Sequence, residues 1–338
     1  MNEILIKDSS AHSSQQARVP ASHVLLEWHG EWSEAVAEAF AALPYDHLMD
    51  PVLVRRLWEA GVGRDRQKIA VVRAPGGTPV GVVPLQKRGK TSWQLLTHYV
   101  MPYDRFFVLP EYTDAALRAL GREIDCYSVS FTRLPANTRM LRPEESWVTR
   151  LGPSYDELMR RTKYAQKDRL YRRQTADMNL REDDYAALPE ALACWQAKWT
   201  AVGSYSTAGR KDDLLLGFQV LAEQGRLKTF SLYDGDKFAA MGIGMIGPRI
   251  LYAITKVQRD EYRKCHAGIR LTLAAMEWAC AEGLAEYDMM TTAGDFKRQW
   301  AQPEVRGYRL VRSPFGSEAL GCVLECAKDA FWRLRDKK

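Results

Sequence analysis

Residues suited to bind phosphate lie together just before an expected helix. Arg263, Lys264 and His266 precede Ala267 and Gly268, where the amphipathic pattern of the helix begins. The first N–H groups of a helix have no partner within it, and they attract anions. A glycine at this point lets a ligand come close to the backbone. The segment predicts a phosphate-binding site; a plain helix-start glycine beside solvated charges is the alternative.

A second group of polar residues could take part in a reaction. Asp288 ends the next expected strand, where α/β proteins gather site residues, and the alternative is a cap or a salt bridge. Lys297 follows nine residues later and could stabilise an oxyanion or a phosphate, unless it is a surface cation. Tyr262 could donate a proton, although a packed tyrosine is commoner. Cys265 could act as a nucleophile, but no partner base is evident, so we interpret it as a loop thiol.

These residues belong to an expected β-α-β unit. An apolar strand is expected at 250–255, a helix from Ala267 and a short strand at 285–290. Two further strands, at 227–233 and 238–246, precede the unit and are separated by turn residues.

The order of strand, helices, three-stranded meander, helix and strand occurs twice along the chain. A diverged internal duplication explains this most simply, and two unrelated α/β domains are the alternative. We expect an α/β (α+β) fold of two tandem domains, each with a mixed, mostly antiparallel sheet flanked by helices. The expected parts are a flexible tail at 1–22, the two domains at 23–140 and 141–315, and a final helix at 316–338.

A long basic helix is expected at 155–178. Its first turns gather the basic residues Arg160, Arg161, Lys163, Lys167, Arg169, Arg172 and Arg173. Charge runs are usually solvated helix faces. The functional alternative is an anionic partner, namely coenzyme A phosphates, a tRNA acceptor stem, or a charged glycan or lipid head group.

Composition excludes several classes of protein. The 338 residues, with a hydrophobic fraction of 46% and a charged fraction of 27%, are typical of a folded globular protein. No apolar run is long enough for a membrane span, so an integral membrane protein is not expected. The six cysteines form no Cys-x-x-Cys pair, so we expect no metal site and a reducing, cytoplasmic location. The net charge of +6 is compatible with an anionic ligand without arguing for one.

Several motifs in the second half carry a family resemblance. They are GRLKTFSLYDGDKFAAMGIGM at 225–245, Asp260-x-Tyr262 with Ala267-Gly268-Ile269, Glu277-Trp278-Ala279 with Glu282-Gly283, and Tyr287-Asp288 followed by Phe296-Lys297 and Trp300. In the first half, PVLVRRLWEA, VGVVPL and MPYDRFFVLP also fit. Over residues 24–312 the chain resembles CelD/BcsL-type polysaccharide-biosynthesis proteins of the GNAT superfamily, which are similar to Fem-type aminoacyl-tRNA-dependent transferases. It departs from that family at Thr292, where glycine is usual, and at His266-Ala267, where Ser-Pro is frequent.

The resemblance implies two tandem GNAT-like domains and an acyl-CoA-dependent N-acyltransferase. It implies acetyl-CoA as the donor and a small-molecule or glycan amine as the acceptor, in polysaccharide or cell-envelope biosynthesis. The implied donor-binding residues are Thr255, Arg263, Lys264, His266, Ala267 and Gly268, and the implied catalytic residues are Asp288, Lys297 and Tyr262. The resemblance also implies that the strand at 250–255 diverges from its neighbour, so that its backbone N–H groups can hold a carbonyl oxygen, and that Tyr262 could donate a proton to the leaving thiolate.

Two other functions stay open from the sequence. Lys297 and the basic helix also suit a Fem-like transferase that uses aminoacyl-tRNA as donor. A duplicated, non-catalytic scaffold of an envelope-biosynthesis complex is the third hypothesis, because the first half lacks the loop-glycine-helix pattern. The acyl chain, the acceptor and the oligomeric state are not determined by the sequence.

Overall fold

A computed structural model describes most of the chain. The described residues are 23–44, 47–61, 67–88, 92–98, 100–103, 106–124, 127–131, 142–162, 165–201, 203, 209–290, 295–312, 323 and 327. The expected tail at 1–22, and all but two positions of the expected final helix at 316–338, lie outside them.

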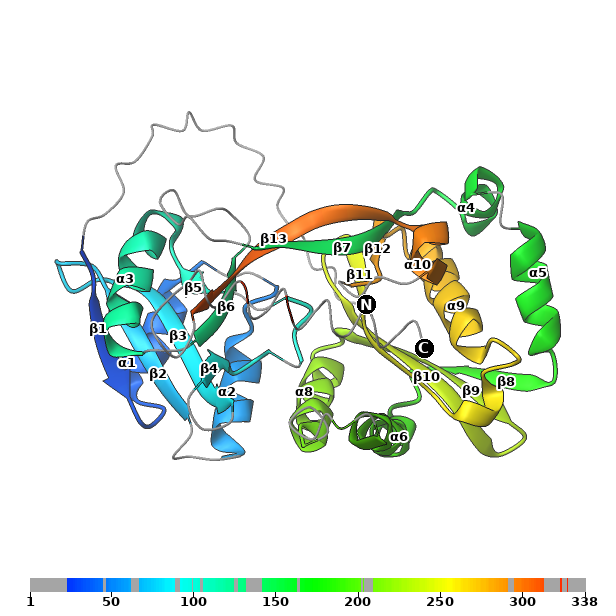
Figure 1. Ribbon diagram of the computed structural model, residues 1–338, viewed down its shortest axis with the longest axis horizontal. Helices are drawn as coiled ribbons and strands as arrows, with labels where there is room; N and C mark the ends of the chain where they lie inside the picture. Colours follow the sequence, from blue (N-terminus) through cyan, green and yellow to red (C-terminus); the bar gives the residue numbers. More distant parts are fainter. Residues whose placement is uncertain are drawn as a thin grey trace, which may run out of the picture.

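The first half consists of a meander of strands with helices packed against it (Figure 1). Its strands are β1 (Leu25–His29), β2 (Gln67–Arg73), β3 (Pro79–Arg88), β4 (Ser92–Leu95), β5 (Phe107–Val108) and β6 (Tyr127–Phe131). Its helices are α1 (Glu34–Ala42), α2 (Pro51–Glu59), the short 3₁₀ turn η2 (Pro110–Tyr112) and α3 (Thr113–Glu123). As the sequence predicts, Asp50 caps α2 by accepting a hydrogen bond from the N–H of Leu53 at 3.0 Å, and Pro51 occupies the first turn.

The second half repeats this arrangement. Its strands are β7 (Arg142–Arg150), β8 (Met178–Glu182), β9 (Leu227–Asp234), β10 (Lys237–Ile246), β11 (Ile250–Gln258), β12 (Glu286–Asp288) and β13 (Gln302–Arg312). Its helices are α4 (Tyr155–Thr162), α5 (Ala165–Gln174), α6 (Leu188–Ala201), α8 (Lys211–Glu223), α9 (Ala267–Ala281) and α10 (Asp295–Trp300), with 3₁₀ turns η3 (Tyr185–Ala187) and η4 (Asp260–Tyr262).

The described strands form one continuous sheet. Its order is β1-β2-β3-β4-β6-β13-β7-β12-β11-β10-β9-β8, with β5 paired to β3. Read inwards from each edge, both halves give an antiparallel four-stranded meander followed by a strand that pairs in parallel, β6 with β4 and β12 with β11. The mixed, mostly antiparallel sheet flanked by helices confirms the expected fold class. The expected domain boundary near residue 140 stays a prediction.

The two halves also share a hydrophobic core. One cluster of buried side chains includes Val36 and Phe107 from the first half and Phe218 and Val257 from the second. A nearly buried ion pair crosses the same interface, between Arg226 and the Asp50 carboxylate at 2.7 Å. Strands β7 and β13 run across the top of Figure 1 from one half to the other. The halves are therefore held by both sheet pairing and core packing.

The expectation of one long basic helix at 155–178 is wrong. The structure has two helices, α4 and α5, and residues from Met178 form strand β8 instead. Strand β8 pairs with β9, with Met178 opposite Asp234 and Leu180 opposite Leu232. This pairing across the fold outweighs the helix propensity of a short polar segment, so sequence pattern alone could not show it.

Helices cover both faces of the second half of the sheet. Helix α9 packs on one face of β9, β10 and β11, and helices α6 and α8 pack on the other face (Figure 1). Among the described residues, no helix is long and apolar enough to cross a membrane. Nor do the described His, Cys, Asp and Glu side chains gather in a group of three that could hold a metal ion.

Candidate active site

Strand β11 loses one of its neighbours halfway along its length. It pairs in parallel with β12 from Ile250 to Tyr252, and β12 then ends at Asp288. From there to Gln258, the described pairing of β11 is to β10 only. The register with β10 also shifts at Ile254, which is an extra residue and so forms a bulge. Bulges bend a strand and are frequent beside active sites. The expected divergence of this strand from its neighbour is present.

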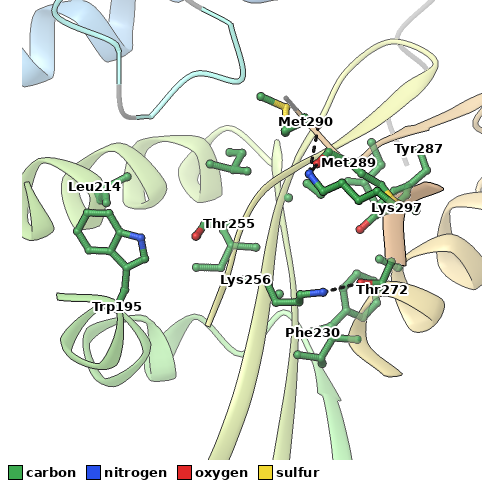
Figure 2. Close-up of a pocket in the computed structure, with 18 of the residues that line it drawn as sticks. Trp195, Leu214, Phe230, Thr255, Lys256, Thr272, Tyr287, Met289, Met290 and Lys297 are labelled. Carbon is green, nitrogen blue, oxygen red and sulfur yellow. Dashed lines mark hydrogen bonds between the residues drawn. The ribbon is translucent and has the colours of Figure 1, made fainter. Parts of the chain in front are cut away.

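A cavity of about 400 Å³ lies where the two strands part. It touches both faces of the sheet, because Thr255 points towards Trp195 and Leu214 while Lys256 points towards α9 (Figure 2). The lining residues are Trp195, Trp199, Leu214, Phe230, Gly242, Ile243, Gly244, Leu251, Ala253, Ile254, Thr255, Lys256, Leu271, Thr272, Ala275, Tyr287, Met289, Met290 and Lys297. This is the volume and largely apolar lining typical of a ligand site.

Lys297 reaches the cavity from helix α10. Its ammonium group donates hydrogen bonds to the carbonyl oxygen of Met289 and, at 3.2 Å, to that of Met290 (Figure 2). Burial lowers the pKa of Lys297 to about 8, and the negative charge of Asp288 acts in the opposite direction. The lysine is thus held in place by backbone carbonyls and titrates close to neutral pH.

Lys256 is a second lysine in the same cavity, and sequence reasoning missed it. Its ammonium group donates a hydrogen bond to the Thr272 hydroxyl at 3.1 Å. Burial lowers the pKa of Lys256 to about 8, and repulsion from Lys297 adds to the effect. By surface area the side chain is exposed. The side chain lines the cavity, and the protein atoms around it keep much of the water away from its ammonium group.

Asp288 does not line the cavity. It is fully buried, and its carboxylate accepts hydrogen bonds from the Tyr103 hydroxyl at 2.5 Å, from the Ser146 hydroxyl and from the N–H of Met290 at 2.8 Å. Met290 has a positive φ of 64°, which a non-glycine residue adopts only where its surroundings hold it. Asp288 therefore holds the turn whose carbonyl oxygens bind Lys297.

This network joins the two halves of the chain. Tyr103 belongs to the first half, and its pKa is raised by burial and by the charge of Asp288. Its ring also lies edge-on to Tyr252 of β11, with 6.0 Å between the ring centroids. The first half thus helps to position the turn beside the cavity, a role that the sequence did not indicate.

The predicted donor-binding residues divide between two places. Thr255 lines the cavity, whereas Arg263 and Lys264 are exposed on the loop before α9. Ala267 is buried, and His266 precedes the helix in a left-handed conformation with φ of 57°. The His266 ring contacts Tyr171 of α5, with 5.2 Å between the ring centroids.

At the start of α9, one backbone N–H group already has a partner within the protein. The N–H of Gly268 donates a hydrogen bond to the Gln258 side-chain oxygen at 3.1 Å. A Cβ atom on Gly268 would lie only 2.7 Å from that oxygen, so the glycine here accommodates Gln258. Tyr262 lies apart from the cavity lining, and its hydroxyl donates to Asp234 at 3.2 Å. The structure therefore separates Tyr262 from Lys297.

Comparison with known proteins agrees with this geometry. Residues 159–298 match the family described as an acetyltransferase (GNAT) domain. These residues therefore form a domain of the acetyltransferase (GNAT) type. No curated protein matches it in sequence.

Three solved structures share the fold over most of the chain. The structure of FemX has a TM-score of 0.50 at 12% identity and covers 84% of this chain and 96% of its own. The C-terminal domain of a putative lysylphosphatidylglycerol synthetase from Agrobacterium fabrum has a TM-score of 0.52 at 11% identity, covering 82% and 91%. A conserved protein of unknown function from Bacteroides thetaiotaomicron has a TM-score of 0.51 at 11% identity, covering 85% and 99%. At these identities the likeness shows the fold alone.

Proposed function

We propose that the protein transfers an acyl group from an acyl-CoA thioester, acetyl-CoA being the simplest, to an amine. The observation that carries this proposal is the cavity at the parting of β11 and β12, which reaches both faces of the sheet. Two substrates can meet in such a passage, the donor from the α9 face and the acceptor from the α6 and α8 face. Holding the two substrates close together in the correct orientation accounts for a large part of the rate enhancement of such a reaction.

The two lysines suit the two needs of this reaction. As the amine attacks, the thioester carbonyl oxygen gains negative charge, which the ammonium group of Lys297 can stabilise. The amine must also lose a proton. A neutral Lys256, with its pKa near 8, is suited to accept that proton. The positive charge of Lys297 lowers the pKa of Lys256, so a charged Lys297 favours the neutral form of Lys256.

The phosphates of the donor would bind at the start of α9. Arg263 and Lys264 are exposed there and could hold a pyrophosphate beside the first helical N–H groups. The amide of Gly268 is already paired, so a phosphate on it requires the Gln258 side chain to turn away. We expect Gln258→Ala to tighten coenzyme A binding, because it frees that amide.

The test is release of free thiol from a panel of acyl-CoAs mixed with amines, amino sugars among them. We expect turnover in the native protein and its loss in Lys297→Met. The control is Lys237→Met, which removes an exposed lysine paired with Glu261. Lys237 is the first residue of β10 and is not among the residues that line the cavity. The proposal fails if no acyl-CoA binds and no thiol is released across the panel.

A transferase that uses aminoacyl-tRNA as its donor is the second candidate, and one observation favours it. Helix α5 lies beside the start of α9, and Arg169 and Arg173 are exposed on it. Such a surface suits a polyanion. RNA that co-purifies with the protein, seen as excess absorbance at 260 nm, would support this donor. Affinity for tRNA that does not fall with added salt would count against it.

The cellular setting is part of the same proposal. We place the reaction in the cytoplasm, with an amine of a polysaccharide or cell-envelope precursor as acceptor. The scaffold hypothesis gains only if a strain carrying Lys297→Met keeps the cellular role of the protein.

A further inference from the structure

The cavity has two ends of different chemistry. On the α9 side, Lys256 and Thr272 contribute polar groups. On the other side, helices α6 and α8 contribute Trp195 and Leu214, which face β11 across the cavity (Figure 2). Trp199 of α6 also lines the cavity. We call this second end, completed by Ile243 and Ile254, the apolar arm. Within the described lining of the cavity, the charged side chains are Lys256 and Lys297, and neither comes from α6 or α8.

The walls of the apolar arm are rigid and aromatic. Trp195 and Trp199 are four residues apart on α6, so they share one face of the helix, and their ring centroids are 6.2 Å apart with the planes at 64°. Both pack against the core that joins the two halves of the chain. The arm is thus lined by aromatic rings that pack against the core. A planar or branched apolar group would find a large contact area there.

The size of the cavity exceeds what the smallest acyl transfer needs. A single water molecule requires roughly 10–15 Å³ of this kind of volume. A cavity of about 400 Å³ therefore has room for much more than an acetyl group and a simple amine nitrogen. Contact between water and apolar walls of this extent is unfavourable, so the walls favour an apolar occupant.

We propose that one substrate carries a bulky apolar group, aromatic or branched aliphatic, next to its reacting atom, and that this group binds in the apolar arm against Trp195 and Trp199. The inference rests on the proposed function, because it takes the reaction to occur beside Lys297. The group belongs either to the acyl part of the donor or to the amine acceptor. The chemistry that the arm recognises is the same in both cases, and the experiment below separates them.

Two substrate series and one binding measurement test the proposal. The donor series is acetyl-, butyryl-, octanoyl- and phenylacetyl-CoA with one small polar amine. The acceptor series is acetyl-CoA with ethanolamine, glucosamine, isoamylamine and phenethylamine. We expect kcat/KM to rise about ten-fold or more along one of the series, because each methylene group fitted into an apolar pocket changes kcat/KM by roughly ten-fold or more. Titration calorimetry with acetyl-CoA, phenylacetyl-CoA, ethanolamine and phenethylamine gives a readout that does not require turnover.

Variants connect the preference to the apolar arm. Leu214→Trp places a large ring in the arm and should lower the preference for the bulky group at least ten-fold, while acetyl transfer to a small amine is affected less. Trp199→Ala enlarges the arm and should move the optimum to a longer or larger group. Leu25→Trp is the matched control, since Leu25 is 66% exposed on the edge strand β1. Circular dichroism confirms that each variant folds.

The outcomes separate this inference from the proposed function. Turnover with equal kcat/KM along both series overturns the inference and leaves acyl transfer standing. If no pair gives turnover, the calorimetry decides. Tighter binding of phenylacetyl-CoA or phenethylamine that Leu214→Trp abolishes supports the apolar arm, and binding no tighter than that of acetyl-CoA or ethanolamine overturns it.

Discussion

Replacing Lys297 by methionine should stabilise the protein while abolishing its activity. The pKa of Lys297 falls from 10.5 to about 8 because the charged form loses water on burial. At about 1.4 kcal/mol for each pKa unit, this shift corresponds to roughly 3 kcal/mol of unfavourable free energy in the folded state. The Lys297 side chain borders the cavity and so keeps some contact with water, and Lys297→Met also loses two hydrogen bonds to backbone carbonyls. Both effects reduce the expected gain in the free energy of unfolding to about 1–2 kcal/mol.

The stability gained by Lys297→Met should decrease as the pH rises. Below pH 8, Lys297 is charged in both the folded and the unfolded state, so the cost of burying its charge is fully present. Between pH 8 and 10.5 the folded protein has released this proton while the unfolded chain still binds it, so the native protein gains stability as pH rises. The advantage of Lys297→Met should therefore be full at pH 7 and largely gone by about pH 10.

Urea unfolding of the native protein and of Lys297→Met at pH 7 and pH 10 measures this difference. Lys237→Met is again the control, because its side chain is exposed and its replacement should not stabilise at either pH. In the thiol-release assay we expect kcat/KM of Lys297→Met to fall by about 10²–10³, the usual effect of removing a group that stabilises an oxyanion. A variant that is less stable than the native protein at pH 7, or a gain that is equal at both pH values, would refute the reasoning.

Three further substitutions test the contacts around the site. Tyr103→Phe removes a donor to the buried carboxylate of Asp288 and should cost about 1.5–3 kcal/mol in urea unfolding, with lower kcat because the turn beside the cavity loosens. Gly268→Ala should destabilise the protein by only about 0.5–1.5 kcal/mol, because the new methyl group displaces the flexible Gln258 side chain from its hydrogen bond with the residue-268 amide, and the same change should cost less in a Gln258→Ala background. Asp50→Ala removes the cap of α2 and leaves its arginine partner with a nearly buried, unpaired charge, so we expect a loss of about 3–5 kcal/mol and a lower melting temperature by calorimetry.

Much of the fold follows from local pattern. The turn residues between β9 and β10, the proline and aspartate at the start of α2, and the apolar periodicity of α9 each predict their element within a few residues. Strand β8 shows the limit, because it begins at Met178, the last residue of the expected helix at 155–178, and forms through pairing with β9. Propensity is a property of neighbours along the chain, and this pairing joins segments about fifty residues apart.

The candidate site was predictable only in part. Lys297 and Thr255 were identified by sequence and both line the cavity. Lys256 was missed, although a single lysine inside an apolar strand is an available signal, because a strand lysine usually faces solvent. Trp195 gave no signal either, since an aromatic residue on an amphipathic helix is the ordinary pattern of a core.

The sequence by itself determined the residue types, the order of the elements and the strand-loop-helix unit around Gly268. Only the tertiary structure decided which of these residues meet. It turned Asp288 away from the cavity towards Tyr103, paired the amide of Gly268 with Gln258, and brought two lysines to one cavity. The physical reason is that β12 ends while β11 continues, and the side of β11 left without this neighbour borders a cavity reached by helices from both faces of the sheet.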